Sequence, residues 1–190
     1  FILYKSQIKI ITMKNLSLRT ANSSDIQNLV ILINQAYRTN NAASWTSEQG
    51  IVAGARINEQ QLRHFLEQKN VRLFVADIQD NPQQGLLGCI GLTFQQDTVE
   101  IGTFCVAAAW QNQGIGRQML KYAEMQAQEI CANLKCYEMF VLDARSELIE
   151  YYERCGYVKT ACIENYPIHA NVGIPLIDLK LQQMKKSIMQ

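Results

Sequence analysis

The 190-residue sequence predicts an α+β fold in which a mixed, mostly antiparallel sheet is flanked by helices. Three apolar stretches, Val71–Ile78, residues 86–94 and Thr98–Val106, follow one another with only short turns between them, as in an antiparallel meander. A glycine turn at residues 111–116 then leads into a long amphipathic helix at residues 115–131. The whole order, β-α-α-β-β-β-α-β-α-β-β, is not a run of βαβ units, which disfavours a doubly wound parallel sheet.

The elements before the meander are a short strand and two helices. Residues 16–19 alternate as a strand does, and either Ser23 or Ser24 is expected to cap the helix that follows, with Asp25 in its first turn. The second helix is expected at residues 58–68. The predicted apolar faces consist of Ile26, Leu29, Val30, Ile33 and Tyr37 in the first helix and of Leu62, Phe65 and Leu66 in the second.

The elements after the glycine turn complete the sheet. Cys136–Leu142 is an almost continuous apolar run, which is typical of a strand buried on both faces. A short helix is expected at residues 146–155, capped by Ser146 and ended by Gly156. The polar and basic residues at the end of the chain are expected to fray. Two closing strands are expected at residues 157–162 and 176–181, with a loop at residues 164–175 between them.

The composition is that of an ordinary soluble globular protein, with 48% hydrophobic residues and a formal net charge of +1. Because there is no basic excess, we expect no nucleic-acid partner. The cysteines are scattered without a Cys-x-x-Cys pair, and His64 and His169 are the only histidines in the sequence. The sequence therefore predicts no metal site.

Residues 1–12 differ in character from the rest of the chain. They precede Met13 and form an apolar run that is too short to span a bilayer and that lacks the cleavage site of a signal peptide. We expect a non-native or disordered extension at residues 1–12 and a single domain at residues 13–190. We also expect no membrane contact and a cytoplasmic location.

The glycine turn, A-W-Q-N-Q-G-I-G-R-Q at residues 109–118, carries the clearest chemical signal. Backbone N–H groups at such a helix start lack helical partners and favour an anion such as a phosphate. A P-loop is excluded because Arg117 and Gln118, instead of Lys and Ser or Thr, follow the second glycine. The dinucleotide fingerprint is excluded because no third glycine follows Gly116 at the required spacing.

The turn, Gln111-x-x-Gly114-x-Gly116, resembles the pyrophosphate signature of the GNAT N-acetyltransferase superfamily. A second stretch, Tyr152-Glu-Arg-Cys-Gly156-Tyr157, is similar to the family's late-helix motif. The resemblance covers nearly all of residues 14–182. It implies the GNAT acyl-CoA N-acyltransferase fold, in which the third meander strand and the strand after the central helix splay apart around acetyl-CoA. The sequences around residues 45–48 and 145–152 look similar to a bacterial subset of small-molecule acetyltransferases.

The resemblance also implies which residues hold the cofactor. Many members carry Asn seven residues before the motif tyrosine, where this chain has Arg145, which either removes a cofactor contact or replaces it with a longer, charged one. Arg117 either reaches a phosphate or faces solvent. Backbone groups of the strand end are expected to pair with the pantetheine arm. The expected cofactor-binding residues are Phe104, Cys105, Val106, Gln111, Asn112, Gln113, Gly114, Ile115, Gly116, Arg117 and Arg145.

Two side chains are expected to take part in acetyl transfer. Tyr152 is implied to donate a hydrogen bond to the departing sulfur; the alternative is packing on the helix face, which suits Tyr151 better. Glu100, six residues before Val106, has the spacing of a glutamate base in some members, although a solvated strand carboxylate is the alternative. Asp143 is a weaker candidate because Asp at a strand end is most often a turn residue.

These residues predict an acetyl-CoA-dependent N-acetyltransferase in which a primary amine of a small molecule or peptide attacks directly. An acyl-enzyme at Cys105 would need a histidine base, and neither histidine lies in a supporting motif. A non-catalytic acyl-CoA-binding regulatory module and generic nucleotide binding are the alternatives, and a homodimer stays open. The loop residues that could shape the acceptor pocket are Trp45, Glu48, Arg56, Tyr166 and His169.

Overall fold

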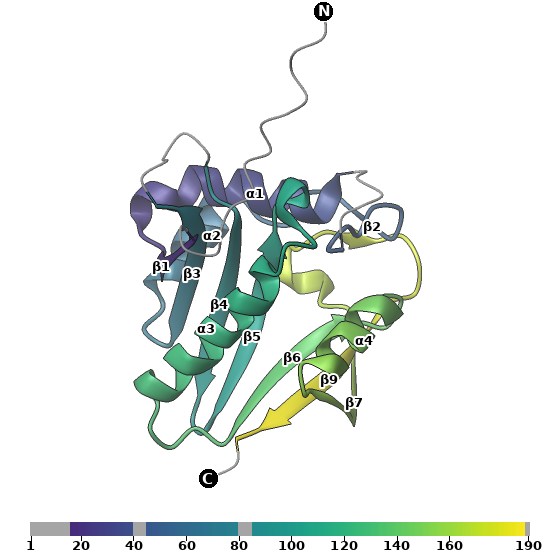
Figure 1. Cartoon of the computed structure of the whole chain (residues 1–190). Helices are drawn as coiled ribbons and strands as arrows, with labels where there is room; N and C mark the ends of the chain where they lie inside the picture. Colours follow the sequence, from purple (N-terminus) through teal and green to yellow (C-terminus); the bar gives the residue numbers. More distant parts are fainter. Residues whose placement is uncertain (1–15, 40–44, 80–84, 189–190) are drawn as a thin grey trace, which may run out of the picture.

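A computed structural model describes residues 16–39, 45–79 and 85–188 (Figure 1). Its main sheet has seven strands in the order β1-β3-β4-β5-β6-β9-β7, and a separate pair joins β2 to β8. Among the described strands only β5 and β6 run parallel, so the predicted mixed, mostly antiparallel sheet is confirmed. The strands are β1 (Leu16–Thr20), β2 (Val52–Ala53), β3 (Val71–Ile78), β4 (Gly88–Gln95), β5 (Thr98–Val106), β6 (Cys136–Leu142), β7 (Val158–Asn165), β8 (Ile174–Pro175) and β9 (Lys180–Ser187). The extension expected at residues 1–12 lies outside the described residues.

Helices cover both faces of the sheet, as the sequence predicts (Figure 1). The helices α1 (Ile26–Arg38) and α2 (Glu59–Glu67) enclose one apolar core against β3, β4 and β5. The helices α3 (Ile115–Ile130) and α4 (Ser146–Arg154) enclose a larger core on the other face. None of the helices in the described part of the chain is long and apolar enough to cross a membrane.

The sheet opens in its middle. Strands β5 and β6 pair only from Thr98 to Glu100 and from Cys136 to Glu138, whereas β4 and β5 pair along nearly their whole length. Beyond this short ladder the two strands diverge, which Figure 1 shows as the gap between β5 and β6. The edges of β5 and β6 beyond this ladder are therefore not paired with each other.

A β-bulge in β5 faces this opening. Cys89 pairs with Cys105 and Gly91 with Gly102, so β5 has one residue more than β4 between the two pairs. Thr103 and Phe104 of β5 thus lie opposite the single residue Ile90 of β4. Thr103 has a left-handed φ of +46°. The bulge therefore lies directly after Gly102. A bulge bends its strand and increases the local twist.

The helix caps differ from those expected. Asn22, and neither Ser23 nor Ser24, caps the turn that leads into α1, and its Oδ1 accepts from the backbone N–H of Ser24 at 2.9 Å. Arg145 is the N-cap residue of α4, where Ser146 was expected. Hydroxyl and amide side chains are nearly equivalent as caps, so the local sequence does not decide between Asn22 and the two serines. The side chain of Arg145 makes no cap bond, so α4 begins there without a side-chain cap.

The end of the sheet was also predicted incorrectly. The last strand is Lys180–Ser187 instead of residues 176–181, and the polar segment expected to fray lies between β6 and β7. Only Met184 of this strand is buried, so apolar periodicity gave no signal for it. Backbone pairing on both sides and ion pairs from Lys185 to Glu138 and from Lys186 to Glu124 stabilise it instead.

Candidate active site

The glycine turn forms the start of α3. Gly114 is the N-cap residue with a φ of +79°, a left-handed conformation that side chains rarely adopt. The first turn of α3 carries no side-chain cap, so its N–H groups face outward at the positive end of the helix dipole. This arrangement suits a phosphate.

A cavity of about 370 Å³ lies beside this turn, and we call it the turn cavity. A Cβ added to Gly116 would lie 3.7 Å from atoms of Phe104, Val106 and Tyr151, which all line the cavity. A longer side chain at this position would therefore occupy the space between these three residues. The cavity is lined by Trp45, Thr46, Phe104, Cys105, Val106, Gln111, Asn112, Gly114, Gly116, Arg117, Leu148, Tyr151, Tyr152 and Arg154.

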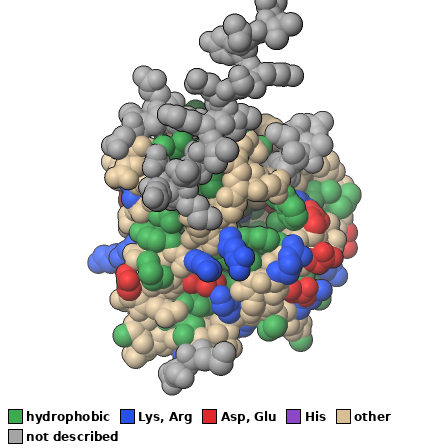
Figure 2. Space-filling model, in the orientation of Figure 1, with side chains coloured by type: hydrophobic (Ala, Val, Ile, Leu, Met, Phe, Trp, Pro, Cys, Tyr) green, Lys and Arg blue, Asp and Glu red, His purple; other side chains and the backbone are tan. Residues whose placement is uncertain are grey.

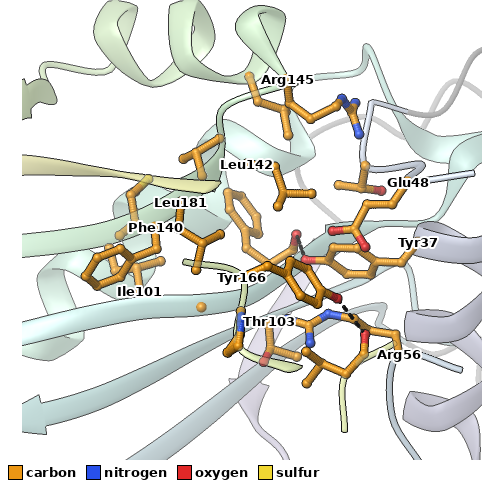
Figure 3. A pocket seen from close by; sticks show the side chains of 18 of the residues that line it. Tyr37, Glu48, Arg56, Ile101, Thr103, Phe140, Leu142, Arg145, Tyr166 and Leu181 are labelled. Atoms are coloured by element: carbon orange, nitrogen blue, oxygen red, sulfur yellow. Dashed lines mark hydrogen bonds between the residues drawn. The ribbon is translucent and has the colours of Figure 1, made fainter. Parts of the chain in front are cut away.

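A second cavity of about 370 Å³, the splay cavity, occupies the opening between β5 and β6 (Figure 3). Figure 3 shows Ile101, Phe140 and Leu181 on one side of it and Tyr37, Glu48 and Arg56 on the other. Its remaining lining includes Glu100, Thr103, Arg145, Glu164 and Tyr166. The two cavities share four lining residues, Thr46, Phe104, Leu148 and Tyr152.

Tyr152 therefore stands where the two cavities meet. It is buried on α4, and its ring packs edge-on against Tyr151 with 5.3 Å between the centroids. Burial, and to a lesser degree Tyr151 and Cys155, raises the pKa of Tyr152 well above its ordinary value of 10.0. The phenol consequently keeps its proton at neutral pH and can act there as a hydrogen-bond donor.

Glu100 lines the splay cavity at the point where β5 and β6 separate. Burial raises the pKa of this half-buried carboxyl group above 4.5, and the carboxylates of Glu138 and Glu164 raise it further. A carboxylate with a raised pKa is a stronger base. Asp143, the weaker candidate, lies at a turn, where its Oδ1 accepts from the backbone N–H of Lys180 at 3.1 Å.

The comparisons with known proteins agree with this geometry. Residues 69–159 match the family model described as acetyltransferase (GNAT) domain. These residues belong to a GNAT acetyltransferase domain. No curated protein sequence matches the chain significantly.

Solved structures share the fold of this GNAT domain at low sequence identity. The ribosomal-protein-S18-alanine N-acetyltransferase from Escherichia coli superposes with a TM-score of 0.67 at 14% identity, over 92% of this chain and 95% of that one. The spermidine/spermine N-acetyltransferase SpeG from Vibrio cholerae gives 0.62 at 17% identity, over 92% and 93%. A GNAT-family acetyltransferase from Staphylococcus aureus Mu50 gives 0.63 at 15%, over 92% and 99%.

Residues 45–48, which we call the strap, cross from one cavity of the GNAT domain to the other. The backbone N–H of Trp45 donates to Oε1 of Gln111 at 2.8 Å, and its indole N–H donates to Oδ1 of Asn112 at 3.0 Å. Nε2 of Gln111 in turn donates to the carbonyl of Val106 at 2.8 Å. Side chains of the glycine turn thus hold the strap against the end of β5.

Arg145 holds the other side of the strap. Its buried guanidinium donates to the carbonyls of Trp45 and Ser47 and forms an ion pair with Glu147. The side chain lines the splay cavity and not the turn cavity. The cofactor contact expected of Arg145 stays a prediction, whereas its bonds to the strap are a role that the sequence did not indicate.

The remaining predicted site residues fall into groups. Most of the expected cofactor residues line the turn cavity, but the side chain of Ile115 is buried in the core, and Gln113 is exposed with its Nε2 donating to the carbonyl of Ala109 at 3.2 Å. Of the expected acceptor residues, His169 lines neither cavity. The expected residues that line the turn cavity are Phe104, Cys105, Val106, Gln111, Asn112, Gly114, Gly116 and Arg117.

Several lining residues had no predicted role at the site, among them Tyr37, Thr46, Leu148 and Tyr151. Tyr151 was expected to pack on the helix face, but it is half-buried in the wall of the turn cavity, and burial raises its pKa to about 12. The doubled tyrosine next to the family motif was the available signal for it.

Basic side chains surround the mouth of the turn cavity. Arg117 on α3 and Arg154 on α4 line it and are exposed, as is Lys121 one turn further along α3. Figure 2 shows several Lys and Arg side chains gathered on the face that carries these helices. Their positive potential adds to that of the helix start and favours a ligand with several phosphates.

Proposed function

We propose that this domain transfers the acetyl group of acetyl-CoA to a primary amine of a small molecule or peptide by direct attack. The observation that carries the proposal is the position of Tyr152, a phenol kept protonated by burial at the junction of two cavities. One cavity adjoins a helix start that is suited to an anion, and the other adjoins the carboxylate of Glu100. The two cavities therefore suit an acetyl donor and an amine acceptor that meet at the phenol of Tyr152.

The turn cavity suits coenzyme A. The uncapped start of α3 offers backbone N–H groups to a pyrophosphate, and Gly116 leaves the cavity wall open. Arg117 and Arg154 add positive charge at its mouth. Bound acetyl-CoA would supply the activated acetyl thioester.

Glu100 would remove the proton of the acceptor. A lysine-like amine has a pKa of about 10.4, so deprotonating it at pH 7 costs about 4.6 kcal/mol. A carboxylate whose pKa burial has raised is suited to accept that proton, directly or through water.

Tyr152 would stabilise the departing sulfur with a hydrogen bond from its phenol. Its raised pKa lies far above the value of about 8.5 of an ordinary thiol, so complete proton transfer to the sulfur is disfavoured. The backbone N–H groups near Cys105 and Val106 remain our candidates for oxyanion donors.

The test is Tyr152→Phe, which removes the hydroxyl and keeps the packing. Acid–base groups contribute at least about 100-fold, so we expect kcat to fall by roughly that factor with nearly unchanged acetyl-CoA binding. Tyr151→Phe, one residue away in the same cavity wall, is the matched control and should retain kcat within about twofold, since it loses no donor at the junction. Thiol release measures the rate, and equal rates for Tyr152→Phe and the parent would remove Tyr152 from the mechanism.

A broad panel of amines separates this function from the alternative. A non-catalytic acyl-CoA-binding module would bind acetyl-CoA but release no thiol with any amine. Turnover of any amine above the rate without amine supports the transferase.

A further inference from the structure

The walls of the splay cavity carry charges of both signs, on different sides. Glu100 lies on β5 and Glu164 on β7, whereas Arg56 comes from the segment between β2 and α2. Figure 3 shows Arg56 beside Tyr37, across the cavity from Ile101 and Phe140 of the central strands. The cavity therefore has an acidic side and a basic side.

The basic side retains its charge. Glu48 pairs with Arg38, and Arg145 pairs with Glu147, so these wall residues are neutralised. Within the described part of the chain no carboxylate pairs with Arg56, whose guanidinium lies 5.3 Å from the ring centroid of Tyr37.

The backbone at Arg56 is fixed. Oδ1 of Asn34 accepts from the N–H of Arg56 at 2.7 Å, and Nδ2 of Asn34 donates to the carbonyl of Ile57 at 2.8 Å. The contact with the ring of Tyr37 and the two hydrogen bonds of Asn34 together position the guanidinium of Arg56 at the cavity. A guanidinium held in this way is suited to bidentate recognition of a carboxylate.

The acidic side also retains its charge. Glu138, directly opposite Glu100 in the short ladder, pairs with Lys185 at 3.1 Å. Neither Glu100 nor Glu164 forms an ion pair with another described residue. An ammonium group entering the cavity would be attracted to these two carboxylates.

We propose that the acceptor is a small primary amine that also carries a carboxylate, with its amine held at Glu100 and Glu164 and its carboxylate held at Arg56. This assignment rests on the proposed transferase function. A diamine would satisfy the acidic side but place its second ammonium against Arg56, and a plain alkylamine would leave the guanidinium without a partner. A cavity of about 370 Å³ suits a small molecule.

The test compares ω-amino carboxylates, from glycine to ε-aminocaproate, with cadaverine and pentylamine as substrates of the full chain. We expect the best amino carboxylate to exceed both amines in kcat/KM by about tenfold or more, because hydrogen bonds to charged groups are the stronger ones. Arg56→Gln should raise KM for that substrate roughly 10- to 100-fold and leave KM for pentylamine unchanged. Arg56→Lys keeps the positive charge but not the planar guanidinium that binds a carboxylate with two hydrogen bonds. It should therefore retain part of the preference for the amino carboxylate.

Arg63→Gln is the matched control, because Arg63 lies on α2 and lines neither the splay cavity nor the turn cavity. It should leave every KM unchanged. The assignment is overturned if cadaverine or pentylamine matches the best amino carboxylate, or if Arg56→Gln keeps the parent's preference. Turnover without preference overturns only this assignment, whereas acetyl-CoA binding without turnover of any amine overturns the transferase function and this assignment together.

Discussion

Burial raises the pKa of two residues of the site, Glu100 and Tyr152, and the two shifts have different chemical consequences. It raises the pKa of Glu100 and so makes that carboxylate a stronger base. It raises the pKa of Tyr152 and so keeps that phenol a donor. One partly water-excluded opening between β5 and β6 can therefore prepare a proton acceptor and a proton donor, with burial as the largest cause of both pKa shifts.

The base can be tested by the dependence of activity on pH. Only deprotonated Glu100 accepts a proton, so kcat/KM should rise with pH through the pKa of Glu100, and the raised pKa moves this rise above 4.5, toward neutrality. Glu100→Gln should lower kcat/KM by about 100-fold or more and remove this limb from the profile. Glu150→Gln, at an exposed position of α4, should preserve it. An unchanged acid limb in Glu100→Gln would assign the limb to another group.

The sequence could indicate Glu100 and Tyr152 because each lies at a fixed spacing from a motif of the chain. It could not indicate Tyr37, whose hydroxyl donates at 3.0 Å to the carbonyl of Phe104, 67 residues further along the chain. Helical periodicity placed Tyr37 on the apolar face of its helix. The role of such a residue depends on which strand that face meets, and this is decided by tertiary packing.

Among the elements, the strap shows how a loop becomes part of the site. Its bonds run to the glycine turn through Gln111 and Asn112 and to the start of α4 through Arg145. The hydroxyl of Thr46, within the strap, also donates to the carbonyl of Ala36 in α1 at 3.1 Å. The strap therefore links the glycine turn, the start of α4 and α1.

Arg145→Lys should weaken the strap. A lysine cannot reproduce the planar guanidinium, so at least one half-buried strap carbonyl loses its charged donor, which costs about 1–3 kcal/mol of unfolding free energy. Because the strap lines both cavities, we expect KM to rise for acetyl-CoA and for the amine, as steady-state kinetics would measure. Glu147→Gln removes the exposed ion pair and keeps the bonds to the carbonyls, so its effect should stay below about 1 kcal/mol. Equal effects of the two variants would assign the role of Arg145 to the ion pair instead.

The elements that the sequence predicted well are those whose apolar pattern decides their packing. Val71–Ile78, Thr98–Val106 and Cys136–Leu142 have the predicted bounds because their buried faces leave little choice. The strand Lys180–Ser187 was missed because β6 and β7 supply its backbone partners, and Glu138 of β6 and Glu124 of α3 supply opposite charges, which no local pattern encodes.

At the scale of the whole molecule, the sheet consists of two parts joined weakly at its centre. One part contains β1, β3, β4 and β5, and the other contains β6, β9 and β7, with only three residue pairs between β5 and β6. The turn cavity spans the junction, since its walls come from β5 and α3 on one side and from α4 on the other. A ligand bound there would contact both parts and stabilise the folded chain as a unit.

Coenzyme A should therefore raise the melting temperature of the protein. A ligand that binds only the folded state adds about 2.7 kcal/mol at a concentration of 100 times its Kd, and ATP should add less because it lacks the pantetheine arm. Gly116→Leu would extend a side chain toward Phe104, Val106 and Tyr151 and block the part of the cavity between them. Since leucine is favoured over glycine within a helix by about 0.5–1 kcal/mol, the ligand-free variant should be as stable as the parent or more so. Differential scanning fluorimetry would then show a stable variant that coenzyme A no longer shifts, and a shift equal to that of the parent would place the ligand elsewhere.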